Sequence, residues 1–143
     1  MRMPVYYKVL IVISILTVAA LSFELLTVPP TTEANIRAAE AYLQINDLPI
    51  PPNQFFHDGC TLAPDSLLWH NMRAACFVHD VAYWAGGPKE LRMAADLELK
   101  AAIAHTGPLG RPLGVLFYAS VRLFGDSPIT KLVNANWGYG WNK

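Results

Sequence analysis

The first 28 residues have a different hydrophobic pattern from the rest of the chain. Arg2 and Lys8 precede residues 9–23, which are apolar except for three hydroxyl side chains, and Glu24 then interrupts the run. A basic stretch followed by a short apolar run is typical of a secretory signal, and small residues suited to cleavage lie at its end. We therefore interpret residues 1–28 as a hydrophobic leader.

Two alternatives to a cleaved signal stay open. An uncleaved membrane anchor would need about 20 apolar residues to span a bilayer, a length reached here only by including Glu24. A buried N-terminal helix of the domain is less favoured, because residues 29–32 (Pro-Pro-Thr-Thr) separate the segment from the first helix predicted after it. Signal and anchor both lead to an exported protein, secreted or held at the membrane by its N-terminal segment.

Residues 29–143 are expected to form one mainly helical domain. Apolar residues at three- and four-residue spacing predict a helix over residues 33–47, capped by Thr31 or Thr32. Four prolines and a glycine predict an ordered loop over residues 48–66. The pattern then predicts helices from about 65 to 84 and from about 89 to 105, separated by a Gly-Gly-Pro turn, and few convincing strands.

The two central helices are expected to pack as an antiparallel pair, because the turn between them is short. His79 and Asp96 lie equally far from the middle of that turn, so the imidazole and the carboxylate would lie at the same height. A hydrogen bond between them would fix the tautomer of the histidine and support an imidazolium during general-base catalysis. The alternative is an ordinary buried histidine, with Asp96 in an exposed ladder between Arg92 and Lys100.

Net charge and cysteine content limit which molecules the protein is expected to bind. The formal net charge is zero and no basic run is present, which argues against nucleic-acid binding. The only cysteines are Cys60 and Cys76, which an exported protein is expected to join as a disulfide. Such a bond would tether the loop of residues 58–65 beside Asp80. Loop carbonyls and a carboxylate are the hard oxygen ligands that calcium takes.

A zinc site is the least favoured interpretation of these residues, because the cysteines lack the close paired spacing of structural zinc sites. Its candidate ligands would be His57, Cys60, His70, Cys76 and His79.

The motif Cys-x-x-His-Asp-x-x-Tyr, formed by Cys76, His79, Asp80 and Tyr83, resembles the signature of the secreted phospholipase A2 superfamily. In the animal enzymes of that family, a calcium-loop cysteine precedes the catalytic histidine by nineteen positions and is bonded to the cysteine three positions before it. Cys60 and Cys76 occupy these two positions. The chain is similar to a divergent, bacterial-type branch of the superfamily.

The resemblance covers residues 58–99 and implies a role for each matching position. It implies that His79 activates a water molecule, that Asp80 binds calcium (Ca2+), and that Tyr83 and Asp96 hold the hydrogen-bond network of the histidine. The loop carbonyls completing the calcium site would be those of Gly59, Thr61 and Ala63. The implied fold is a central antiparallel helix pair with a disulfide-tethered loop.

The implied function is calcium-dependent hydrolysis of a phospholipid acyl ester at a membrane surface. The alternative is a non-catalytic, membrane-associated binding module that keeps the phospholipase A2-like scaffold. The apolar segment 115–124, with Tyr118 and Arg122, and the tryptophans Trp137 and Trp141 could face the lipid. We expect most of them to be ordinary core.

Overall fold

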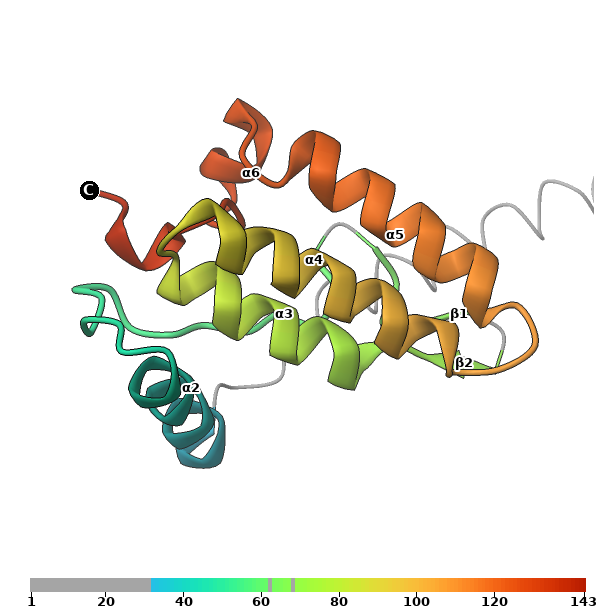
Figure 1. The fold of residues 1–143 in the computed structure, drawn as a ribbon, viewed down its shortest axis with the longest axis horizontal. Helices are drawn as coiled ribbons and strands as arrows, with labels where there is room; N and C mark the ends of the chain where they lie inside the picture. The colour runs from blue at the N-terminus through green and yellow to red at the C-terminus, as the bar shows by residue number, and fades with distance from the viewer. Residues whose placement is uncertain (1–31, 62, 68) are drawn as a thin grey trace, which may run out of the picture.

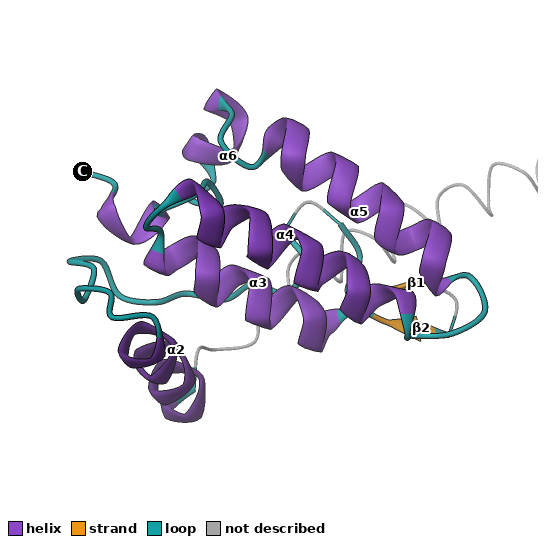
Figure 2. Cartoon of the chain, viewed as in Figure 1, coloured by secondary structure: helices purple, strands orange, loops and turns teal. Residues whose placement is uncertain are grey.

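The computed structural model describes residues 32–61, 63–67 and 69–143, and this part of the chain is mainly helical, as expected (Figures 1 and 2). Its helices are α2 (Glu33–Ile45), α3 (Arg73–Ala85), α4 (Lys89–Ala104), α5 (Gly110–Phe124), α6 (Pro128–Leu132) and the short 3-10 helix η1 (Tyr139–Trp141). Strands β1 (Ser66–Leu67) and β2 (His70–Asn71) pair antiparallel. Within these described ranges, no helix is long and apolar enough to cross a membrane. The leader expected over residues 1–28 lies outside the described residues.

Helices α3 and α4 lie side by side at the centre of the fold, joined by the predicted short turn (Figure 1). Gly86 caps α3 with φ +69°, a conformation that glycine adopts without a Cβ penalty. Pro88 is the N-cap of α4, which ends one residue before the predicted boundary. The turn therefore fixes the register of the two helices, and with it the heights of their facing side chains.

The predicted start of α3 near residue 65 was wrong, because a β-hairpin precedes the helix. The main-chain N–H of Met72 donates to the Asp65 carbonyl at 2.8 Å, which closes the hairpin. The Asn71 side chain accepts from the N–H of Arg73 at 3.1 Å and so satisfies a donor of the first helical turn. The helix accordingly begins at Arg73.

Helix α5 begins earlier than the apolar segment 115–124 indicated, and it packs closely on α4. Pro112 falls in its first turn, where a missing N–H is tolerated. Gly110 and Gly114 are its buried residues, and a Cβ at Gly114 would collide with the Lys100 carbonyl. Much of the rest of α5 is exposed, Leu123 by 74%, so assigning most of this segment to the core was wrong.

The aromatic, glycine-rich segment 137–141 closes the α3–α4 turn. The indole N–H groups of Trp137 and Trp141 donate to the carbonyls of Gly87 (3.1 Å) and Ala85 (2.9 Å). The N–H of Gly138 donates to the Tyr83 carbonyl at 2.6 Å. Alternating glycines allow the backbone to approach α3, while the indoles reach the last carbonyl of α3 and a carbonyl of the turn that follows it.

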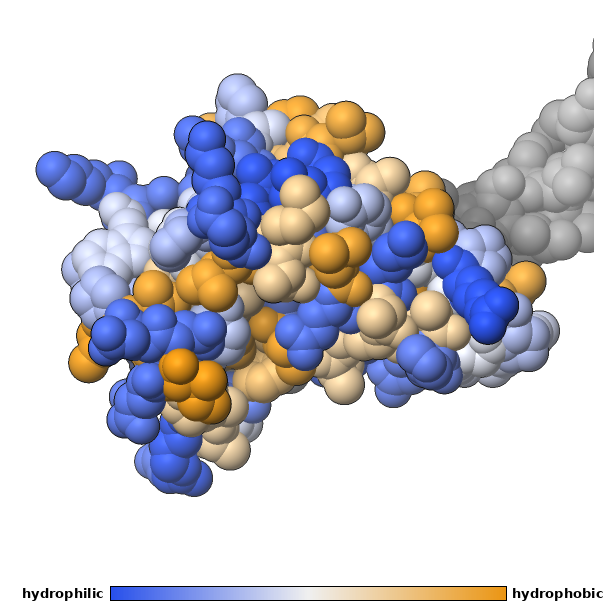
Figure 3. Space-filling view, in the orientation of Figure 1, coloured by the Kyte–Doolittle hydropathy of each residue, from blue (hydrophilic) through white to orange (hydrophobic). Residues whose placement is uncertain are grey.

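The buried hydrophobic side chains of the described residues form two clusters, and both include residues of α3. One contains Ala39 and Leu43 of α2 with Phe55, Trp84 and Tyr139. The other surrounds the two cysteines and contains Met72, Leu99 and Ile103. On the face of the molecule seen in Figure 3, hydrophilic and hydrophobic residues are interspersed.

We expect Gly140→Ala to lower the free energy of unfolding by about 1–3 kcal/mol through overpacking. The new Cβ would lie 2.6 Å from both the Trp84 carbonyl oxygen and the Pro51 Cβ. Urea unfolding would measure the loss, with Lys143→Ala, at an exposed position nearby, as the control. Equal midpoints for the two variants would contradict the close approach.

Candidate functional site

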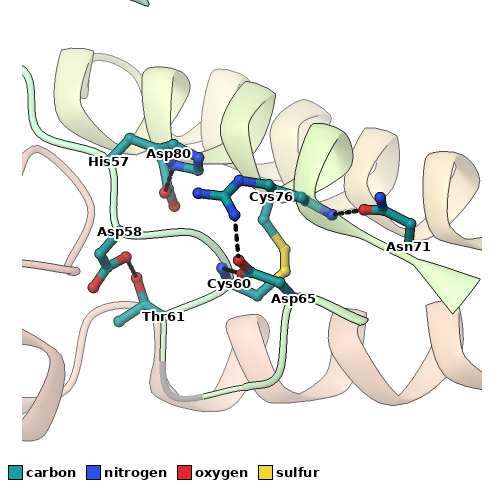
Figure 4. Close-up of a disulfide and its surroundings, with 9 residues drawn as sticks. His57, Asp58, Cys60, Thr61, Asp65, Asn71, Cys76 and Asp80 are labelled. Carbon is teal, nitrogen blue, oxygen red and sulfur yellow. Dashed lines mark hydrogen bonds and ion pairs between the residues drawn. A yellow bond between two sulfur atoms is a disulfide. The ribbon is translucent and has the colours of Figure 1, made fainter. Parts of the chain in front are cut away.

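A disulfide between Cys60 and Cys76 joins the loop of residues 58–65 to α3, which confirms the expected pairing (Figure 4). The loop is held by polar contacts as well. The Asp65 carboxylate accepts from the main-chain N–H of Cys60 at 2.7 Å and pairs with Arg73 of α3 at 3.1 Å. Gly59 adopts φ +91° against the same carboxylate, where a Cβ would collide with it. The disulfide also removes two of the five ligands of the zinc alternative.

His79 and Asp96 are brought together across the α3–α4 interface. The imidazole Nε2 lies 2.9 Å from Asp96 Oδ1, and Asp96 has no exposed surface, so the exposed ladder with Arg92 and Lys100 does not form. Tyr83 donates its hydroxyl to the same Oδ1 at 2.9 Å. Burial acts to raise the pKa of Asp96, but hydrogen bonds from His79, Arg122 and Tyr83 outweigh it and lower that pKa. An ionised carboxylate only accepts, so Nε2 carries a proton, and in the neutral imidazole the lone pair resides on Nδ1.

Two arginines complete this network, and neither was assigned to it by sequence reasoning. Arg122 of α5 donates from Nη1 to Asp96 Oδ2 at 2.7 Å. Arg92 of α4 donates to the Tyr83 hydroxyl at 3.3 Å and to the Val121 carbonyl at 3.2 Å. The sequence pattern places Arg122 only among residues that could face lipid. No local pattern indicates its partner, because 26 positions and an inter-helix turn separate it from Asp96.

Asp80, the next residue on α3, faces the loop instead. Its Oδ2 lies 2.7 Å from His57 Nδ1, a contact drawn in Figure 4. The Asp80 side chain is 16% exposed. Burial raises the pKa of Asp80 from 3.8 to about 6, against the hydrogen bond and charge of His57, which lower it. The nearby Asp58 carboxylate adds a smaller effect that raises it further. Asp58 itself accepts from the Thr61 hydroxyl at 2.8 Å.

A cavity of about 550 Å³ opens beside these residues, a size typical of small-molecule sites. His79, Asp80 and Tyr83 reach its wall from α3, and Asp58 and Tyr139 from the two segments beside it. Most of the remaining wall is apolar and includes Leu99 of α4, Leu113, Leu116, Phe117, Val121 and Phe124 of α5, and Ile129 of α6. A smaller cavity of about 260 Å³, lined by Tyr42 and Glu98, reaches His79 from the α2 side. No described residue bonds to His79 Nδ1, and the His79 side chain lines both cavities.

The oxygen donors beside Asp80 are of the kind that a hard cation takes. Thr61 and Ala63 line the same cavity as Asp80, whereas Gly59 is buried in the loop next to them. Among the described residues, no three His, Cys, Asp or Glu side chains are grouped to hold a metal ion. A cation here would therefore depend on main-chain carbonyls together with Asp80 and Asp58. Two interacting carboxylates in a partly buried site fit such a cation, because its charge would relieve their repulsion.

Comparisons with known proteins do not identify a relative. No protein-family model matches the chain, and neither the curated proteins nor the solved structures searched gave a match.

Removing the disulfide should lower the free energy of unfolding by about 3 kcal/mol, the value expected when a loop of this size is opened. The separation between the two cysteines is 16 residues. Urea unfolding of the double variant Cys60→Ala/Cys76→Ala would measure the loss. Reductant should shift the wild type to the same midpoint and leave the variant unchanged; a variant that still responds to reductant would contradict the assignment.

Asp80 should make folding less favourable as pH rises. Because its pKa in the folded state, about 6, exceeds the usual 3.8, its stabilising contribution is complete below pH 3.8 and is lost as pH rises through 6. We expect the unfolding free energy of the wild type, relative to Asp80→Asn, to fall by roughly 2–3 kcal/mol between pH 4 and 7. Urea unfolding in chelator would measure both proteins. Parallel pH dependences would show that Asp80 does not titrate in this way.

Proposed function

We propose that the protein is a phospholipase A2-like hydrolase that cleaves a phospholipid acyl ester with calcium. One observation carries the proposal: a buried His79–Asp96 pair and the adjacent Asp80 meet at the wall of one largely apolar cavity. The motif resemblance described above supports the same function from the sequence. These residues support the proposal because they would provide a base, a buried carboxylate partner for it and an apolar binding space.

His79 is the proposed general base. The Nε2–H donates to Asp96 Oδ1, so Nδ1 can accept a proton from a water molecule at the cavity wall. The water oxygen then adds to the acyl carbon, and the proton passes from Nδ1 to the glycerol oxygen as the ester bond breaks. Asp96 stabilises the imidazolium between these steps, while Tyr83 restrains the carboxylate.

Asp80 is the proposed carboxylate ligand of calcium, with Asp58 beside it, and the carbonyls of Thr61 and Ala63, two residues that line the same cavity, are the proposed further ligands. When bound, calcium would supply positive charge for the oxygen of the polarised acyl carbonyl. His57 keeps Asp80 oriented through its 2.7 Å hydrogen bond. Tyr139 donates to the Phe56 carbonyl at 2.6 Å and so braces the segment that carries His57.

The cavity and its rim support a lipid substrate. Phe56, Leu116, Phe124 and Ile129 line the cavity, and all four are more than half exposed. An exposed apolar rim around an apolar cavity is typical of a surface that meets another molecule rather than water. An acyl chain in this space would leave its ester near His79 and Asp80, the polar groups of the wall.

Fatty-acid release from mixed phospholipid vesicles tests the proposal. We expect release by the wild type in calcium, none in chelator, and a loss on the order of 100-fold or more in His79→Gln, because the base is removed. Asp80→Asn should raise the calcium concentration needed for release. Arg37→Gln, which removes an exposed pair with Glu33, is the control for charge and should behave as wild type.

Vesicle binding without release would favour the non-catalytic binding module instead. Release that persists undiminished in His79→Gln would exclude His79 as the base and remove the proposed mechanism.

A further inference from the structure

We propose that Arg122 of α5 is a positioning residue for the His79–Asp96 pair, holding the Asp96 carboxylate in the orientation that the imidazole needs. This inference rests on the proposed function, because it assigns a residue to the same reaction. Arg122 contacts neither the base nor the substrate space through its charged group; it acts through Asp96.

The geometry restrains the carboxylate at both oxygens. Oδ1 accepts from His79 at 2.9 Å and from Tyr83 at 2.9 Å, both on α3. Oδ2 accepts from Arg122 on α5 at 2.7 Å, the shortest of the three contacts. Rotation of the carboxylate would break contacts on both sides, so the acceptor of the imidazole N–H is fixed in direction.

The charges around Asp96 point to the same role. The groups that face it are His79 and Tyr83 from α3 and Arg122 from α5. Arg92 of its own helix donates to the Tyr83 hydroxyl and the Val121 carbonyl, not to Asp96. Arg122 alone among those in direct contact with Asp96 is permanently charged. A carboxylate without exposed surface is costly unless a cation compensates it. The lowered pKa of Asp96 agrees with that compensation.

The contact between Arg122 and Asp96 also connects the proposed base to the helix that forms part of the cavity wall. Val121, next to Arg122, lines the cavity, and its carbonyl accepts from Arg92 at 3.2 Å. The position of α5 is thereby tied to the Asp96 network at the point where the helix covers the proposed acyl space. Arg122 is itself 31% exposed, so its replacement leaves no cavity inside the core.

The test compares Arg122→Gln, which removes the charge, with Arg122→Lys, which keeps it. Arg111→Gln on the exposed face of the same helix is the matched control. We expect kcat for vesicle hydrolysis to fall roughly 10- to 100-fold in Arg122→Gln with KM little changed, because the lost contact orients the base rather than the substrate. Arg122→Lys should recover part of kcat, and Arg111→Gln should match the wild type.

Carbon-13 NMR of the Asp96 carboxyl group gives a readout independent of activity. We expect the pKa of Asp96 to rise in Arg122→Gln relative to the wild type and to Arg111→Gln, and to rise less in Arg122→Lys. An unchanged Asp96 titration in Arg122→Gln would overturn the inference, as would unchanged kcat. If the wild type releases no fatty acid, the proposed function fails, and the titration still decides whether Arg122 controls this carboxylate.

Discussion

The buried charge of Asp96 is the constraint on which the rest of this structure depends. A carboxylate without exposed surface must have its hydrogen bonds supplied by neighbouring elements, because water does not reach it. The donors come from α3 and α5, while α4 carries the carboxylate itself. Satisfying one side chain therefore fixes how three helices pack, and it also determines that Nε2 of His79 is the nitrogen held at the helix interface.

The adjacent residues His79 and Asp80 share one helix but belong to two different networks. Successive side chains on an α-helix diverge by about 100°, so His79 reaches Asp96 on α4 while Asp80 reaches His57 in the loop. The helix thus carries both the proposed base and the proposed cation ligand. Because the two side chains point in different directions from the helix, His79 and Asp80 can be adjacent in sequence while each has its own partner.

The sequence predicted the features that local chemistry controls. The Gly-Gly-Pro turn separates α3 from α4. Because His79 and Asp96 lie equally far from this turn, their contact could be predicted. The start of α3 could not be predicted, because a hairpin closed by main-chain hydrogen bonds competed with helix propensity over the same residues. The contacts of Arg122 and His57 depend on how distant elements pack, which no local pattern encodes. The aromatic segment 137–141 is a further case, since the acceptors of its indole N–H groups, Ala85 and Gly87, lie some fifty positions earlier.

The disulfide between Cys60 and Cys76 holds only one part of the cavity wall, the loop, so the two parts of the wall should respond differently to redox conditions. In a thiol-rich compartment, where such bonds are kept open, the segment bearing Asp58 and Thr61 would be held by its polar contacts and by the packing of Cys60 and Ala63. The imidazole and its acid would keep their partners, because helix packing rather than sulfur holds them. Reduction would thus loosen the part of the wall proposed to bind a cation and spare the part proposed to transfer a proton.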